Sequence, residues 1–133
     1  MSAWRRVASE YMPWCQKVAE QASSPMALWI EILLAFERAF DSGDTARTGE
    51  VLRYARWCWN SSSDDLVNAV GCAFFEHLPE QVGIRKAIPT WFSRDEYVRL
   101  REVFRYHGGD EAIAELDLAF KYLQRGQRPP RNR

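Results

Sequence analysis

The sequence predicts an all-α fold, and three observations support this. Apolar residues recur at intervals of three and four along almost the whole chain, as on the buried face of a helix. No stretch shows the strict alternation and β-branched enrichment of a strand. Short polar links with cap and breaker residues separate the periodic segments. We expect about six helices in antiparallel pairs, forming a compact helical bundle or a short HEAT-like stack.

The first helical region is interrupted by proline. Trp4 and Val7 belong to a leading segment, and Pro13 lies in the first turn of the first main helix. Proline costs little in a first turn, because the N–H it lacks would have no helical partner there. We expect Ser9 to cap this helix.

Two longer helices should follow. Ser24–Pro25 is typical of a helix start, and the apolar spacing continues to about Phe40. The next helix is expected to begin at Asp44 or Thr45 and to end before the NSSSDD stretch at 60–65.

A fourth long helix is predicted after that polar stretch, capped by Ser63 or Asp64. Apolar side chains recur in it every four residues: Leu66, Val70, Phe74 and Leu78. Pro79 should end this helix, because the residue before a proline disfavours the α conformation.

The remaining chain predicts a connector and two more helices. Glu80–Pro89 contains Gly83 and is expected to be a connector or a single turn. Ser93 and Glu96 have capping-box spacing and should start a helix that ends at 107–109. Asp110 should open the last helix.

Length and composition predict one domain. The chain has 133 residues, of which 47% are hydrophobic, enough apolar material for one core. We expect a single helical domain over residues 1–125 and a disordered basic tail over residues 126–133, GQRPPRNR.

Charge and hydropathy argue against two classes of partner. Lys and Arg number 18 and Asp and Glu also number 18, so a nucleic-acid partner is not expected. The most apolar stretch, Met26–Phe36, is interrupted by Glu31 and is too short to span a bilayer. A secretory signal would require an apolar run after the basic residues near the N-terminus, and the sequence has none there. These features predict a cytoplasmic protein without a membrane partner.

The stretch GCAFFEHLPE, residues 71–80, raises the question of a metal or catalytic site. Cys72 and Glu76 would share one face of a continuous helix, while His77 would point about 140° away from Cys72. A zinc-binding helix of the HExxH type would need a second histidine, which is missing. His77 and His107 each lie near an expected helix end, where an imidazole complements the helix dipole. We therefore expect no metal ligands.

Nucleophilic catalysis is not expected either. Cys58 and Cys72 are the candidate nucleophiles, each with one of the two histidines. Cys72 is expected inside a helix, where a desolvated thiol has a raised pKa and is a poor nucleophile. The glycines of HGGDE at 107–111 are expected to form a helix end and a turn, not a phosphate loop. The sequence thus predicts no catalytic residues, no cofactor and no enzyme activity.

Charge and aromatic residues point instead to a protein partner. Between residues 57 and 83 the charged residues are all acidic and could steer a basic partner. Trp57 and Trp59 lie about 200° apart on a helix, so both cannot face the core. The expected contact residues are Asp64, Asp65, Glu76, Glu80, Trp57 and Trp91.

The segment SSSDDLVNAVGCAFFEHL resembles a family of small, helical, uncharacterised bacterial domains. The similarity rests on about 20 residues around Asp64 to Leu78, with Val67, Asn68 and Val70 followed by Phe74 or Phe75 with Glu76. Such domains resemble immunity proteins of toxin systems, which act by binding a toxin. The resemblance implies no catalytic residues.

These inferences lead to one expected function and two alternatives. We expect a protein-binding domain, a bacterial immunity protein that neutralises a cognate toxin by covering its active site. One alternative is a small helical enzyme or ligand-binding domain that uses His77 or His107 with Glu76. The other is a structural scaffold protein that forms a homodimer.

Overall fold

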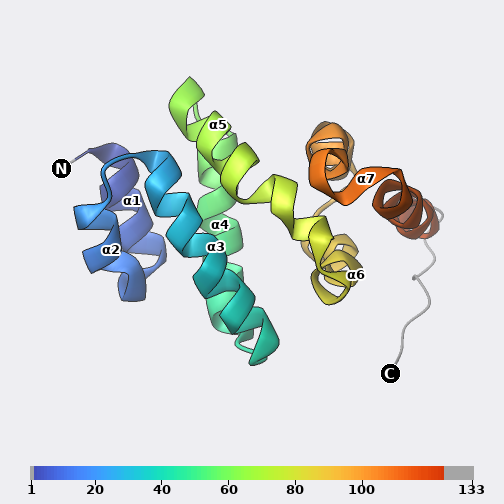
Figure 1. Cartoon of the computed structure of the whole chain (residues 1–133), viewed down its shortest axis with the longest axis horizontal. Helices are drawn as coiled ribbons and strands as arrows, with labels where there is room; N and C mark the ends of the chain where they lie inside the picture. Colours follow the sequence, from blue (N-terminus) through green and yellow to red (C-terminus); the bar gives the residue numbers. More distant parts are fainter. Residues whose placement is uncertain (1, 125–133) are drawn as a thin grey trace. The chain divides into compact units, whose positions relative to one another are not determined.

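The structure is a computed structural model that describes residues 2–124, with side chains up to residue 122. It confirms the all-α fold class: these residues form seven α-helices and two 3-10 helices and contain no strand (Figure 1). They belong to two compact units, unit 1 (Met1–Phe74) and unit 2 (Phe75–Arg133). The single domain over residues 1–125 stays a prediction, and the tail predicted over 126–133 lies outside the described residues.

Unit 1 begins with the predicted break at proline. Helix α1 (Ala3–Tyr11) is followed by the 3-10 helix η1 (Pro13–Cys15) and by α2 (Gln16–Gln21). α1 and α2 lie side by side (Figure 1). The cap assigned to Ser9 is wrong, because its hydroxyl donates to the Arg5 carbonyl oxygen inside α1 at 3.1 Å. Met12 precedes the 3-10 turn instead.

Three longer helices form the rest of unit 1: α3 (Pro25–Asp41), α4 (Thr45–Trp59) and α5 (Asp64–Ala73). The three helices start where the sequence predicted. At each start a side-chain oxygen accepts a backbone N–H of the first turn, which has no acceptor within the helix. The capping residues are Ser24, Asp44 and Ser63. α3 packs against both α4 and α5.

The core of unit 1 is aromatic. The fully buried Trp29 on α3 stacks on Tyr54 of α4, with ring centroids 5.3 Å apart. The ring of Phe74 lies 4.9 Å from the same indole and 5.1 Å from the ring of Phe36, measured between centroids. The Tyr54 hydroxyl donates to the Trp4 carbonyl oxygen at 2.9 Å, which links α4 to α1.

The fourth predicted helix ends earlier than expected. α5 stops at Ala73, Phe74 has non-helical angles (φ −127°, ψ −68°), and Phe75–Glu80 forms the 3-10 helix η2. The predicted end at Leu78 is therefore wrong. Pro79 has no N–H to donate to the Phe75 carbonyl, and its ring would clash with that group in an α-helix, so α geometry is disfavoured over this turn. Phe74 and Leu78 are both buried, as their spacing indicated.

Unit 2 contains η2 and two further helices, α6 (Val82–Trp91) and α7 (Arg94–Gln124). The connector predicted over Glu80–Pro89 is thus wrong, because α6 covers most of it. Pro89 lies near the end of α6, where a proline removes only one backbone hydrogen bond and the helix can tolerate it. The capping box is confirmed: the Ser93 N–H donates to Glu96 at 2.9 Å, and the Glu96 N–H donates to the Ser93 hydroxyl at 3.1 Å.

A sharp break divides α7 where the sequence predicted a helix end. Gly109 has φ 77° and ψ −180°, a conformation almost restricted to glycine. Asp117 ties the two halves of α7 together. Its carboxylate accepts the Tyr97 hydroxyl at 2.7 Å and two Arg101 N–H groups at 2.9 and 2.6 Å.

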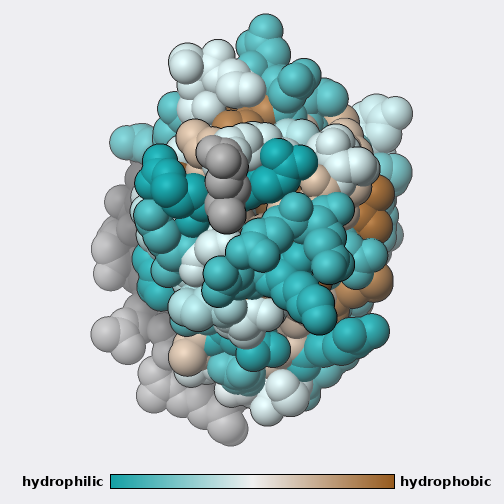
Figure 2. All heavy atoms as spheres, turned by 90° about the vertical axis from the view of Figure 1, so that its left-hand side faces the viewer, coloured by the Kyte–Doolittle hydropathy of each residue, from teal (hydrophilic) through white to brown (hydrophobic). Residues whose placement is uncertain are grey.

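The side of unit 1 that carries α1 and α2 is mostly hydrophilic, and its apolar areas are small (Figure 2). Among residues 2–124, no helix combines the length and the apolar character that crossing a bilayer requires.

Candidate functional site

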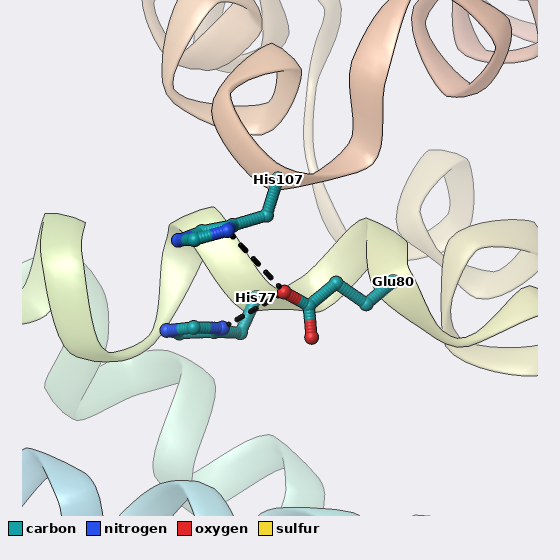
Figure 3. A group of neighbouring side chains, drawn as sticks. All are labelled: His77, Glu80 and His107. Carbon is teal, nitrogen blue, oxygen red and sulfur yellow. Dashed lines mark hydrogen bonds and ion pairs between the residues drawn. The ribbon is translucent and has the colours of Figure 1, made fainter.

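Two histidines and two glutamates meet at the surface of unit 2. The rings of His77 on η2 and His107 on α7 stack with centroids 4.5 Å apart and planes 17° apart. Glu80 reaches both imidazoles: its Oε1 lies 3.1 Å from Nδ1 of His77 and 3.6 Å from Nδ1 of His107 (Figure 3). Glu76 Oε1 lies 3.4 Å from Nε2 of His107. We call these four residues the histidine–glutamate cluster.

The backbone brings η2 and α7 together at this point. A Cβ atom on Gly108 would lie 2.9 Å from Cβ of Pro79, closer than carbon atoms normally approach. Glycine at 108 therefore permits the contact that carries His107 over His77. The Arg85 Nε–H donates to the Pro79 carbonyl oxygen at 2.9 Å and holds η2 against α6.

The cluster is partly open to solvent. The side chains of His77, Glu80 and His107 are 30%, 44% and 37% exposed to solvent, whereas the side chain of Glu76 is 17% exposed. The ligand atoms of His77, Glu80 and His107 all lie within 4.8 Å of one another. Imidazole nitrogens and a carboxylate oxygen are common zinc ligands, so the arrangement offers a donor set as well as ion pairs.

The sequence prediction missed this convergence. It placed His77 and His107 at separate helix ends and expected Glu76 and His77 to diverge around one helix. The 3-10 geometry of η2 changes those directions, and the Gly109 break turns the chain just after His107. Two glycines directly after a histidine were the signal that an element could approach closely there.

Cys72 is not the buried core residue that the sequence indicated. It is half-buried, and its thiol donates to Oδ1 of Asn68 at 3.5 Å. Cys15 and Cys58 are buried, and burial raises the pKa of each thiol to about 11.

The predicted contact residues are divided between the two units. Asp64 and Asp65 are exposed in the first turn of α5, and Trp57 is half-buried on α4, all in unit 1. Glu76 and Glu80 belong to the histidine–glutamate cluster of unit 2. Trp91, also in unit 2, is half-buried at the end of α6.

Trp57 also borders an open concavity of unit 1, where α1, α4 and the following link meet. This open concavity has a volume of about 470 Å³ and is lined by Tyr11, Arg53, Arg56, Trp57, Asn60 and Ser61. Trp57 stacks on the buried Tyr54 at 5.9 Å and 12°, so its ring is held in place. The lining therefore combines aromatic surface with positive charge; we call it the α4 concavity.

Residues 5–104 match the model of a family described as a domain of unknown function, DUF7674. The chain belongs to the DUF7674 family. The part that matches DUF7674 includes unit 1 from residue 5 and, in unit 2, Glu76, His77 and Glu80, and it ends before His107. No curated protein and no solved structure matches the chain.

Proposed function

We propose that this chain is a cytoplasmic protein-recognition domain of the immunity type, which neutralises a cognate toxin by covering its active site. The α4 concavity carries the proposal, because it presents a fixed tryptophan and two arginines in one open depression. Trp and Arg are the residue types that contribute most often to binding hot spots. Its chemistry suits an acidic segment of a partner.

The acidic pair in the same unit adds a second charge for docking. Asp64 and Asp65 are exposed and follow the Asn60 and Ser61 lining of the concavity by a few residues. Opposite charges placed close together specify the orientation of a partner more than they raise its affinity. In this proposal the arginines bind the acidic segment, and the two aspartates select a basic neighbour on the partner.

The first experiment tests the function itself. Toxin candidates encoded beside the gene are expressed in a host cell with and without this chain, and growth is measured. We expect growth to be restored by one of them, with a direct complex between the purified proteins. A toxin that stays fully active in the presence of excess chain would count against the proposal.

The second experiment tests the surface. Trp57→Ala and Arg53→Glu should each lower the affinity for the partner, the tryptophan change by about thirtyfold or more, equivalent to about 2 kcal/mol. Arg38→Glu, the same change at an exposed arginine of α3 outside the concavity, is the control and should bind normally. If all three variants bind the partner with the affinity of the unaltered chain, the α4 concavity is not the binding surface.

Asp64 and Asp65 need a neutral substitution as well as charge reversal. Both lie in the first turn of α5, where negative charge favours the helix by about 0.3–1 kcal/mol. Replacement of both by Asn tests the binding role with a smaller effect on the helix than Lys would have. We expect weaker binding and a slower association rate that depends less on salt.

A small helical enzyme or ligand-binding domain is the second candidate. The histidine–glutamate cluster favours it, because His107 lies 3.4 Å from Glu76 and that alternative uses His77 or His107 with Glu76. The homodimeric scaffold is tested by the solution mass of the purified chain.

A further inference from the structure

The donor atoms of the histidine–glutamate cluster share one side of the two stacked rings. Both imidazoles turn Nδ1 toward the same Glu80 oxygen (Figure 3). We propose that His77, Glu80 and His107 bind one divalent transition-metal ion through these three atoms. The inference does not rest on the α4 concavity, since every group in it belongs to unit 2 and that concavity belongs to unit 1.

Glu76 supports this arrangement from the other side of one ring. Its Oε1 lies 3.4 Å from Nε2 of His107, so the carboxylate favours a proton on that nitrogen. The lone pair of His107 then lies on Nδ1, which faces Glu80. A carboxylate that orients a metal-bound histidine in this way is common in zinc proteins. The Glu76 side chain is only 17% exposed, so the surrounding atoms limit its movement.

The distances between the donor atoms suit one ion, and a tilt of the two stacked rings would direct both Nδ1 lone pairs toward it. Zinc–nitrogen bonds of about 2.0–2.1 Å and tetrahedral angles place two ligand atoms about 3.3 Å apart. Nδ1 of His77 and of His107 already lie 3.1 and 3.6 Å from the Glu80 oxygen. The widest ligand pair lies within 4.8 Å, so the two rings must tilt toward each other. Their exposure of 30% and 37% leaves room for that rotation.

The donor set selects the kind of ion. Two imidazoles and one carboxylate suit zinc and its first-row neighbours, whereas calcium and magnesium prefer oxygen ligands throughout. Three protein ligands leave a position for water in a four-coordinate site. The ion would link η2 to α7 at the place where Gly108 and Pro79 are in close contact.

The binding experiment uses the full chain without a tag, after treatment with a chelator. Co²⁺ is added as a spectroscopic probe, and its visible absorption is followed before and after competition with Zn²⁺. We expect saturation at one ion per chain, displacement by Zn²⁺ and no competition by excess Mg²⁺. Absence of saturable Co²⁺ absorption up to about millimolar free metal, the weakest affinity that counts as binding here, would overturn the proposal.

Variants assign the ligands. His77→Ala, His107→Ala and Glu80→Gln should each weaken Co²⁺ binding by more than about tenfold, and Glu76→Gln by about 10- to 100-fold as expected for an orienting carboxylate. Glu111→Gln changes an exposed carboxylate of α7 outside the cluster and should bind as the unaltered chain does. Far-UV circular dichroism verifies that each variant is folded. Cys72→Ser tests the half-buried thiol as a competing site.

A measurement on the unaltered chain covers the case in which a variant does not fold. The sequence contains two histidines, so their imidazole proton signals are readily assigned in an NMR spectrum. Zn²⁺ should shift both sets of signals together at one equivalent. Binding that leaves either histidine unchanged, or that is lost with Cys72→Ser but not with the histidine variants, would refute the proposed site.

Discussion

Replacement of Gly108 by alanine is the most direct test of the contact that assembles the histidine–glutamate cluster. The new Cβ would lie 2.9 Å from Cβ of Pro79 and 3.1 Å from Cβ of Ala112. Carbon atoms pack best at about 3.5–4.0 Å, so the first overlap is about 0.6 Å or more. The neighbouring atoms belong to a rigid ring and a short side chain, which cannot rotate away.

The magnitude follows from two opposing effects. Overpacking of this kind costs about 1–3 kcal/mol. Alanine is a better helix former than glycine by about 0.5–1 kcal/mol, which offsets part of the cost. We therefore expect Gly108→Ala to lower the free energy of unfolding by up to about 2.5 kcal/mol, with a middle value of about 1 kcal/mol that is equivalent to a decrease in Tm of several degrees.

Gly49→Ala provides the matched control. Gly49 lies inside α4, and the nearest atom to an added Cβ is the mobile end of Arg53 at 3.5 Å, an ordinary contact. The same substitution should therefore raise stability by about 0.5–1 kcal/mol. Urea unfolding followed by far-UV circular dichroism measures both variants. If both stabilise the chain equally, η2 and α7 are not in close contact at Gly108.

Three further perturbations test the backbone and the polar contacts. Gly109→Ala should cost about 1–3 kcal/mol in urea unfolding through backbone strain alone, because no atom lies within 4 Å of the new Cβ. Arg101 hydrogen bonds, aided by Tyr97, hold the pKa of Asp117 below its usual value, so the stability they provide exists above about pH 4 and is lost as the pH falls. The unaltered chain should lose more stability between about pH 7 and about pH 3 than Asp117→Asn does, by a modest amount because 42% of the carboxylate side chain is exposed. Ser24→Ala removes the acceptor of the Ala27 N–H and should lower the free energy of unfolding by about 1 kcal/mol, measured by the urea midpoint.

Features controlled by neighbouring residues could be predicted from the sequence. The helix starts after Ser24, Asp44, Ser63 and Ser93 were predicted because a cap needs one side chain and the N–H groups two or three positions later. The break at Gly109 followed from the glycine pair. Phe74 and Leu78 are buried although α5 ends before them. The spacing of apolar residues indicates which side chains face the core, but it does not determine the exact backbone geometry.

The histidine–glutamate cluster could not be predicted in the same way. His77 and His107 are 30 residues apart, and their contact depends on the 3-10 geometry of η2 and on the Gly108–Pro79 approach. Neither is encoded in a local pattern. The expected directions of residues 72–77 assumed α geometry, which grouped Glu76 with Cys72 and separated it from His77.

The proposed metal ion and the contact at Gly108 act on the same pair of elements, and their free energies are therefore coupled. A ligand that binds only the native arrangement stabilises it by RT ln(1 + [L]/Kd), about 2.7 kcal/mol at a hundredfold excess over Kd. An alanine at 108 that moves η2 away from α7 must weaken Zn²⁺ binding, and by reciprocity Zn²⁺ must then stabilise that variant less than the unaltered chain. Gly49→Ala changes unit 1 only, so its gain from Zn²⁺ should equal that of the unaltered chain.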